Sequence, residues 1–210
     1  MDQGDERRSV RPCLIFAEVF VRTAKDRDAF HGLSFYDAPM ISHFQMFARY
    51  NGWANNRLYD AVSKLSDADY RAPRGAFFGS VHGTLNHLLV ADRIWMYRFT
   101  GAGPTYTKLD DVPCADFQTL WRERLAEDLR IVDFVDALND RSLVTKFSYR
   151  TITGSIDITQ PLASALAHFF NHQTHHRGQV HGLLTALGGR DAAPSLDLIL
   201  FQRETGLGMS

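Results

Sequence analysis

Hydrophobic positions recur with helical spacing along four long stretches of the chain. Between residues 40 and 65, apolar and aromatic side chains return every three or four positions and so fall on one face of a helix. Ser80 and the pair Gly188-Gly189 are typical residues for the start and the end of a helix. The pattern predicts four long helices, over residues 41–66, 80–100, 114–138 and 161–187.

A different pattern occupies residues 142–159, which are rich in β-branched and aromatic side chains and contain Thr153-Gly154 as a turn signal. This segment predicts a short β-hairpin. Pro161 then suits the first position of the last long helix, where no hydrogen bond needs its missing N–H. A final apolar segment, 196–204, is expected to pack back on the helices. Four long helices with short connections predict an all-α fold, an antiparallel four-helix bundle with a short β-hairpin before the last long helix.

The segment before Met40 lacks this periodicity. Its arginine pair and the apolar residues that follow are superficially similar to a twin-arginine signal, but the apolar stretch is short and is broken by Glu18, Arg22 and Lys25. We interpret residues 1–39 as a poorly ordered extension, or as sequence added by a mis-assigned start, and residues 40–210 as one folded domain.

The composition excludes several classes of function. The chain has 210 residues, with 23 Lys and Arg against 24 Asp and Glu, and no basic stripe, so neither nucleic acid nor a membrane surface is expected as a partner. Cys13 and Cys114 lie far apart, which argues against a disulfide framework and favours a cytoplasmic location. No apolar run approaches the length that spans a bilayer.

The distribution of histidine points to a specific site, because four of the nine histidines lie between positions 168 and 176. His172 and His176 are four residues apart, on one face of the last long helix and within its apolar stripe. Imidazole is the commonest metal ligand in proteins, and such a pair can reach one ion. The alternative is that both are buried polar residues satisfied by neighbours. Position 173 is Gln, so the pair is not the HExxH motif of metalloproteases.

A third ligand would have to come from another helix. His87 is the first candidate, because it lies among apolar residues in the middle of the second helix, and His43 in the first helix is the second. His82 is too close to a helix start. Periodicity does not choose between His87 and His43. The remaining nearby histidines are interpreted as surface residues or as supports of the ligands: His168, His175 and His181.

Four stretches carry a resemblance to a known family: YNGWANNRLYDAV (50–62), RGAFFGSVHGTLNHLLVADRIWMYRFTG (74–101), PLASALAHFFNHQTHHRGQVHGLLTALG (161–188) and LDLILFQRE (196–204). Together they resemble the DinB family of damage-inducible, four-helix-bundle metalloproteins, over about residues 40 to 206. In that family an LNH motif supplies one metal-binding histidine and an NHxxxHRGQ motif supplies two. These motifs fall on His87, His172 and His176, so the resemblance implies one divalent ion, zinc or nickel, bound by these three residues.

The resemblance also implies a function. Some members of the family are thiol S-transferases and others are proposed hydrolases, so a metal-dependent enzyme of either type is expected, acting on a small molecule such as a low-molecular-weight thiol. A homodimer is also implied. Three neutral histidines leave open positions on an ion, as in catalytic zinc sites. The alternatives are a non-enzymatic stress-related protein that holds a metal or a small ligand, and a bundle without metal. A di-iron site is excluded, because no Glu-x-x-His motif occurs on the helices concerned.

Residues around the motifs have further interpretations. The acidic residues of the 105–116 loop and Tyr50 are candidates for a general base. Arg177 is expected to pair with a carboxylate on a neighbouring helix, with Asp92 as the first choice. Gly178 is expected to permit a close approach of helices. The tryptophans are expected in the core: Trp53 and Trp95.

Overall fold

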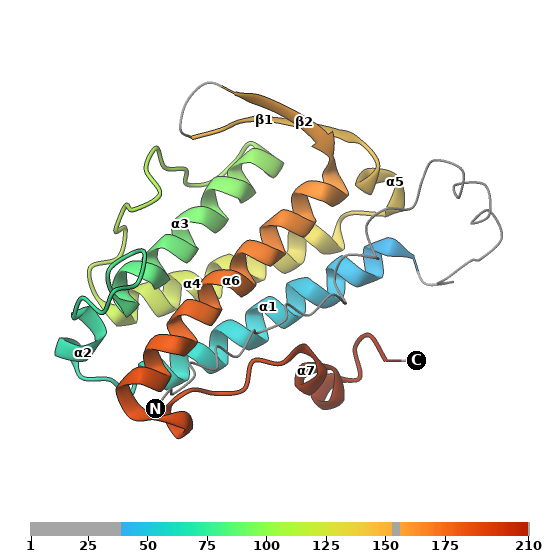
Figure 1. The fold of residues 1–210 in the computed structure, drawn as a ribbon. Helices are drawn as coiled ribbons and strands as arrows, with labels where there is room; N and C mark the ends of the chain where they lie inside the picture. The colour runs from blue at the N-terminus through green and yellow to red at the C-terminus, as the bar shows by residue number, and fades with distance from the viewer. Residues whose placement is uncertain (1–38, 153–155, 210) are drawn as a thin grey trace, which may run out of the picture. The chain divides into compact units, whose positions relative to one another are not determined.

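A computed structural model describes residues 39–152 and 156–209 of the chain, and in these residues the fold is mostly helical with one small sheet. Figure 1 shows the long helices running alongside one another, with the hairpin at the end where α6 begins and α2 at the opposite end. The elements are α1 (Met40–Val62), α2 (Asp67–Arg71), α3 (Val81–Thr100), α4 (Phe117–Asp136), α5 (Asp140–Leu143), β1 (Lys146–Arg150), β2 (Asp157–Pro161), α6 (Leu162–Gly188), η3 (Arg190–Ala192) and α7 (Leu198–Thr205).

The four predicted long helices correspond to α1, α3, α4 and α6, with ends that differ by a few residues. The Ser80 hydroxyl caps α3 by accepting from the Gly83 N–H at 3.1 Å, and Gly189 ends α6 with a φ of 76°. The first helix ends earlier than predicted because Ser66 caps a separate short helix, α2, where its hydroxyl accepts from the Asp69 N–H. None of the described helices has the length and apolarity that a bilayer crossing requires.

The predicted hairpin is confirmed: β1 and β2 pair antiparallel, from Lys146 opposite Pro161 to Arg150 opposite Asp157. The predicted turn at Thr153-Gly154 lies outside the described residues, as does the extension before Pro39. Pro161 is the last residue of β2 and the N-cap of α6, not its first helical residue, because it still pairs in the sheet.

Apolar packing is divided between the two ends of the helices. Helix α1 packs against α4 and α6, and α3 packs against the same two helices. One apolar cluster lies toward α2 and contains Leu58, Leu85 and Leu184, whereas the other lies toward the hairpin and contains Trp95, Ile131 and Phe169. Helix α7 packs on α1 through Phe201, which confirms the predicted return of the last segment.

Between the two clusters lies a layer of buried polar side chains, here called the polar layer: Asn51, Asn55, Asp92, Arg124, Asp128 and Arg177. The Arg124 guanidinium donates to the Asp92 carboxylate at 2.6 Å and lies 3.1 Å from the Asp128 carboxylate. The two asparagine amides donate to the same Asp128 oxygen, and their own oxygens accept from Arg177. The layer therefore links α1, α3, α4 and α6 at mid-height.

The polar layer corrects the prediction that Arg177 pairs with Asp92. Arg124 reaches Asp92 from α4, so Arg177 is held by amide oxygens of α1 and lies over the Tyr50 ring at 5.3 Å. Burial raises the pKa of Asp92 to about 7, although the charge of Arg124 opposes this shift.

The interpretation of Gly178 is also wrong. A Cβ added there would meet nothing within 4 Å, because Gly178 faces outward. Trp95 is buried as expected, whereas Trp53 is partly buried against Phe201 and donates to the Glu204 carboxylate at 2.9 Å.

Candidate metal centre

The three histidines of the two motifs meet between α3 and α6, and are called the triad from here on. His87 lies in the middle of α3, and His172 and His176 lie one turn apart on α6. The His87 Nε2 atom is 3.3 Å from the His172 Nε2 and 3.2 Å from the His176 Nε2. One ligand atom from each lies within 4.8 Å of the other two. The sequence-based expectation that these three side chains converge is therefore met.

The His87 and His176 rings each form a hydrogen bond through Nδ1, the nitrogen that points away from the middle of the triad. These bonds fix which ring nitrogen carries the proton. The His87 Nδ1 lies 2.8 Å from the Leu109 carbonyl oxygen, which can only accept, so Nδ1 carries the proton and donates. The His176 Nδ1 lies 2.8 Å from the Gln179 side-chain oxygen and donates to it in the same way. In the neutral rings both Nε2 atoms therefore present lone pairs toward the centre, the arrangement that ligating histidines use.

Burial keeps the triad neutral. It lowers the pKa of His87 to about 4 and that of His172 to about 3, and it also lowers the pKa of His176. The neighbouring imidazoles of the triad lower the pKa values of His87 and His172 further. The ligands would thus be available to a metal ion at neutral pH without the loss of a proton.

Two of the three nitrogen–nitrogen distances in the triad suit a small divalent ion. Four ligands at about 2.0–2.1 Å from a tetrahedral zinc ion are roughly 3.3 Å apart from one another. The two Nε2–Nε2 distances of 3.2 and 3.3 Å agree with that value. A His87 Nε2 and a His176 Nε2 at this distance repel each other, because no hydrogen lies between their lone pairs, and a cation between them would remove the repulsion.

Phe78 closes one side of the triad. Its ring stacks on the His87 ring, with centroids 3.6 Å apart and planes 14° apart, and it packs edge-to-face with the His176 ring. Gly83, in the first turn of α3, permits this contact, because a Cβ there would lie 2.1 Å from the Phe78 carbonyl oxygen. The loop before α3 thus lies directly against the helix that carries His87.

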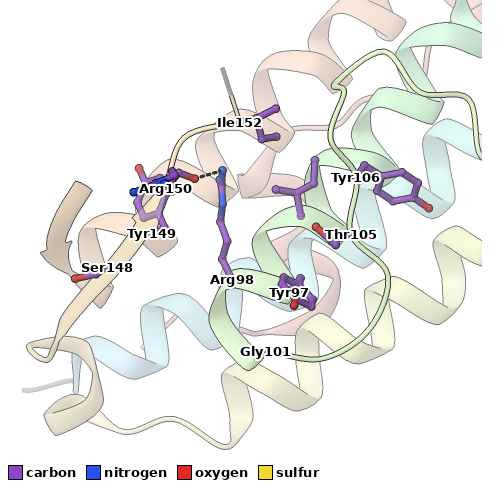
Figure 2. A pocket seen from close by; sticks show the side chains of 10 residues that line it. Tyr97, Arg98, Gly101, Thr105, Tyr106, Ser148, Tyr149, Arg150 and Ile152 are labelled. Atoms are coloured by element: carbon purple, nitrogen blue, oxygen red, sulfur yellow. Dashed lines mark hydrogen bonds between the residues drawn. The ribbon is translucent and has the colours of Figure 1, made fainter. Parts of the chain in front are cut away.

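Two adjoining cavities lie near His172. A cavity of about 270 Å³ is lined by Trp95, Leu109, His168 and His172, among others, and so reaches the triad. A second, of about 410 Å³, lies between the end of α3, the loop after it and the hairpin (Figure 2). Both share Ile94, Arg98, Tyr149 and Ile152 in their walls. A small molecule could approach His172 from this side.

The other candidate residues lie apart from the triad. His43 is exposed and packs edge-on against Phe47, with ring centroids 4.7 Å apart. The Tyr50 hydroxyl donates to the Leu196 carbonyl oxygen at 2.6 Å. Asp116, in the 105–116 loop, caps α4 by accepting from the Thr119 N–H, and no carboxylate of that loop lines either cavity. His82 contacts the Cys114 carbonyl oxygen.

Sequence reasoning missed the residues that support the triad. Gln179 stands in the second motif three residues after His176, and this helical spacing was an available signal for a side-chain contact. Phe78 and Leu109 lie in irregular loops, where no periodic pattern predicts that either residue contacts His87.

Comparison with known proteins gives a consistent result. The family model described as "DinB family" matches residues 40–206. Protein DinB of Bacillus subtilis (strain 168) is 24% identical over 164 residues, which cover 74% of this chain and 92% of that protein. The crystal structure of a DinB-like protein from Bacillus cereus ATCC 10987 is similar in fold, with a TM-score of 0.52 and 19% identity over 68% of this chain and 91% of that one. This chain belongs to the DinB family.

Proposed function

We propose that the triad binds one divalent metal ion, zinc or nickel, and that the protein uses it in thiol S-transferase or hydrolase chemistry on a small molecule. The observation that carries the proposal is the pair of lone-pair nitrogens, on His87 and His176, which face each other at 3.2 Å with their tautomers fixed by Leu109 and Gln179. Buried polar atoms without compensation are costly, and a cation at this point would compensate them.

The proposal extends to the architecture. The mutual packing of α1, α3, α4 and α6 supports an antiparallel four-helix bundle as the scaffold of this site, with ligands on two facing helices. Such a scaffold holds the ligands on rigid elements, so little reorganisation would accompany binding.

Three neutral histidines leave positions on a divalent ion for a reactant, and an ion so held lowers the pKa of a bound water or thiol. The residues of this chain supply the rest. Leu109 and Gln179 orient the ligating rings, Phe78 covers one side, and the cavity beside His172 admits the reactants on the other. The charged side chains that line the two cavities are cationic, which favours an anionic reactant such as a thiolate and supports the thiol-transfer route.

The test combines metal analysis with a thiol-dependence assay. The purified wild-type protein should contain about one equivalent of zinc or nickel, and an alanine at any triad position should lower this content severely. The matched control His43→Ala should keep the metal, because His43 is an exposed histidine of α1. Retention of metal by the triad variants would refute the site.

Turnover decides between the enzymatic and the non-enzymatic function. An electrophile offered together with low-molecular-weight thiols tests transfer, and an activated ester tests hydrolysis. Metal-dependent turnover of either, lost in His172→Ala, is the expected result. A protein that holds its metal and turns over neither would be a metal- or ligand-binding protein and would contradict the enzymatic part of the proposal.

A further inference from the structure

Arg98 stands in the wall between the two cavities. It extends from the last turn of α3, and Figure 2 shows it between β1, with Tyr149 and Arg150, and the loop that carries Thr105. Because Arg98 lines both the cavity that reaches His172 and the larger one beside it, a molecule in either cavity would meet its guanidinium.

The guanidinium of Arg98 is held in place by two aromatic rings. It lies 4.8 Å from the centre of the Trp95 ring and 4.7 Å from that of Tyr149. One terminal nitrogen donates to the Arg150 carbonyl oxygen at 3.0 Å. A guanidinium has five N–H groups, and within the described part of the chain this is the one side-chain hydrogen bond that Arg98 makes. Its remaining donors have a fixed direction and no hydrogen-bond partner among residues 39–152 and 156–209.

The charge of Arg98 is also uncompensated within the described residues, where it forms no ion pair with a carboxylate. Arg150, in the same cavity wall, provides a contrast, because its guanidinium pairs with Asp157 at 2.9 Å. The described residues that line the two cavities include these two arginines together with His168 and His172, and no Asp or Glu. A positively charged, half-buried group in a cavity without anionic neighbours favours an anionic ligand.

We propose that these cavities bind a small carboxylate-bearing molecule, whose carboxylate is held by Arg98 and whose apolar body lies against Ile94 and Ile152. The two oxygens of a carboxylate match the planar fork of one guanidinium. The larger cavity, of about 410 Å³, has the size of ordinary small-molecule sites. The far end of the molecule points to His172, and in this respect the inference rests on the proposed metal function. Arg98 is thus the residue that selects the substrate by charge.

Benzoate and its uncharged analogue benzamide are suitable probes, and ligand-detected NMR measures weak binding of each to the full-length chain. The wild-type protein, both zinc-loaded and metal-free, should bind benzoate about tenfold or more tightly than benzamide. Arg98→Met removes the charge and keeps an apolar stem, so it should abolish this preference. Arg98→Lys keeps the positive charge but lacks the planar guanidinium, so it should retain part of the preference for benzoate. The matched control is Arg150→Met combined with Asp157→Asn, which removes a neutral ion pair and should leave the preference unchanged.

Equal binding of the two probes, a preference that survives in Arg98→Met, or an equal loss in the variant that lacks both charges of the Arg150–Asp157 pair would overturn the inference. The metal-free arm excludes benzoate bound to zinc as the source of the signal. A protein that takes up zinc but shows no benzoate preference would refute the role of Arg98 and leave the proposed function standing. A protein that takes up no metal would refute the proposed function, and the metal-free measurement would still decide the role of Arg98.

Discussion

Replacement of Gln179 tests whether this residue orients His176 for the proposed metal ion. The Gln179 side-chain oxygen accepts from the His176 Nδ1 at 2.8 Å and so keeps the Nε2 lone pair directed at the centre of the triad. Loss of such a partner of a ligating histidine weakens metal affinity by roughly 10–100-fold, or about 1.4–2.7 kcal/mol. Gln179→Leu, which keeps a good helix former in α6, should weaken zinc binding by this amount. Gln179→Glu supplies a stronger acceptor and should bind zinc at least as tightly as the wild-type protein.

Competition against a fluorescent zinc chelator at neutral pH measures these affinities. The matched control is His175→Ala, because His175 contacts the other end of the Gln179 amide, at 3.3 Å, and is not one of the three clustered ligands. This variant should bind zinc with nearly unchanged affinity. Wild-type affinity in Gln179→Leu, or an equal loss in His175→Ala, would show that the tautomer of His176 is not set by Gln179.

Four further predictions follow from the same structure. In the metal-free protein the pKa of His87 is about 4 instead of 6.5, so the folded state binds fewer protons than the unfolded one and stability should fall as the pH drops from about 6.5 towards 4. Thermal unfolding of the wild-type protein and His87→Gln, measured across this pH range, isolates the contribution of His87. The same pH dependence of the unfolding temperature in both proteins would contradict the prediction. Arg124→Met leaves Asp92 buried without its partner and should lower the free energy of urea unfolding by about 3–5 kcal/mol, where a loss below about 1 kcal/mol would refute the argument. Gly83→Ala should displace the loop that carries Phe78 and lower zinc affinity, measured by the same competition, and unchanged affinity would show that the loop does not support the site. A chain that begins at Met40 should unfold at the same temperature and hold the same metal content as the full chain, and a large loss of either would show that the extension contributes.

The helices and the pair of His172 and His176 could be predicted because their signals are local. Helical periodicity, the cap at Ser80 and the four-residue spacing of His172 and His176 all lie within a few turns of one helix. The choice of His87 over His43 came from the family motifs, since both histidines satisfied the periodicity of their helices.

The remaining features depend on contacts between segments far apart in the sequence. The partner of Asp92 is Arg124, 32 residues away on another helix, and a charged residue on α4 gives no local sign that it will be buried. The orientation of the His87 ring depends on Leu109, in a loop without periodicity. The cavities form only when α3, its following loop and the hairpin come together, so the position of Arg98 in both cavity walls could not be predicted from the sequence.

The polar layer makes the helices of this protein hard to slide past one another. Apolar side chains can exchange neighbours at little cost, but Arg177 moved by one helical turn, about 5.4 Å, would leave its amide partners and meet apolar side chains. His176 precedes Arg177 directly, so its position along α6 is fixed by the contacts of Arg177 with α1. An ion at the triad would therefore meet a ligand spacing that the helices set, and an ion too large for that spacing would bind less tightly.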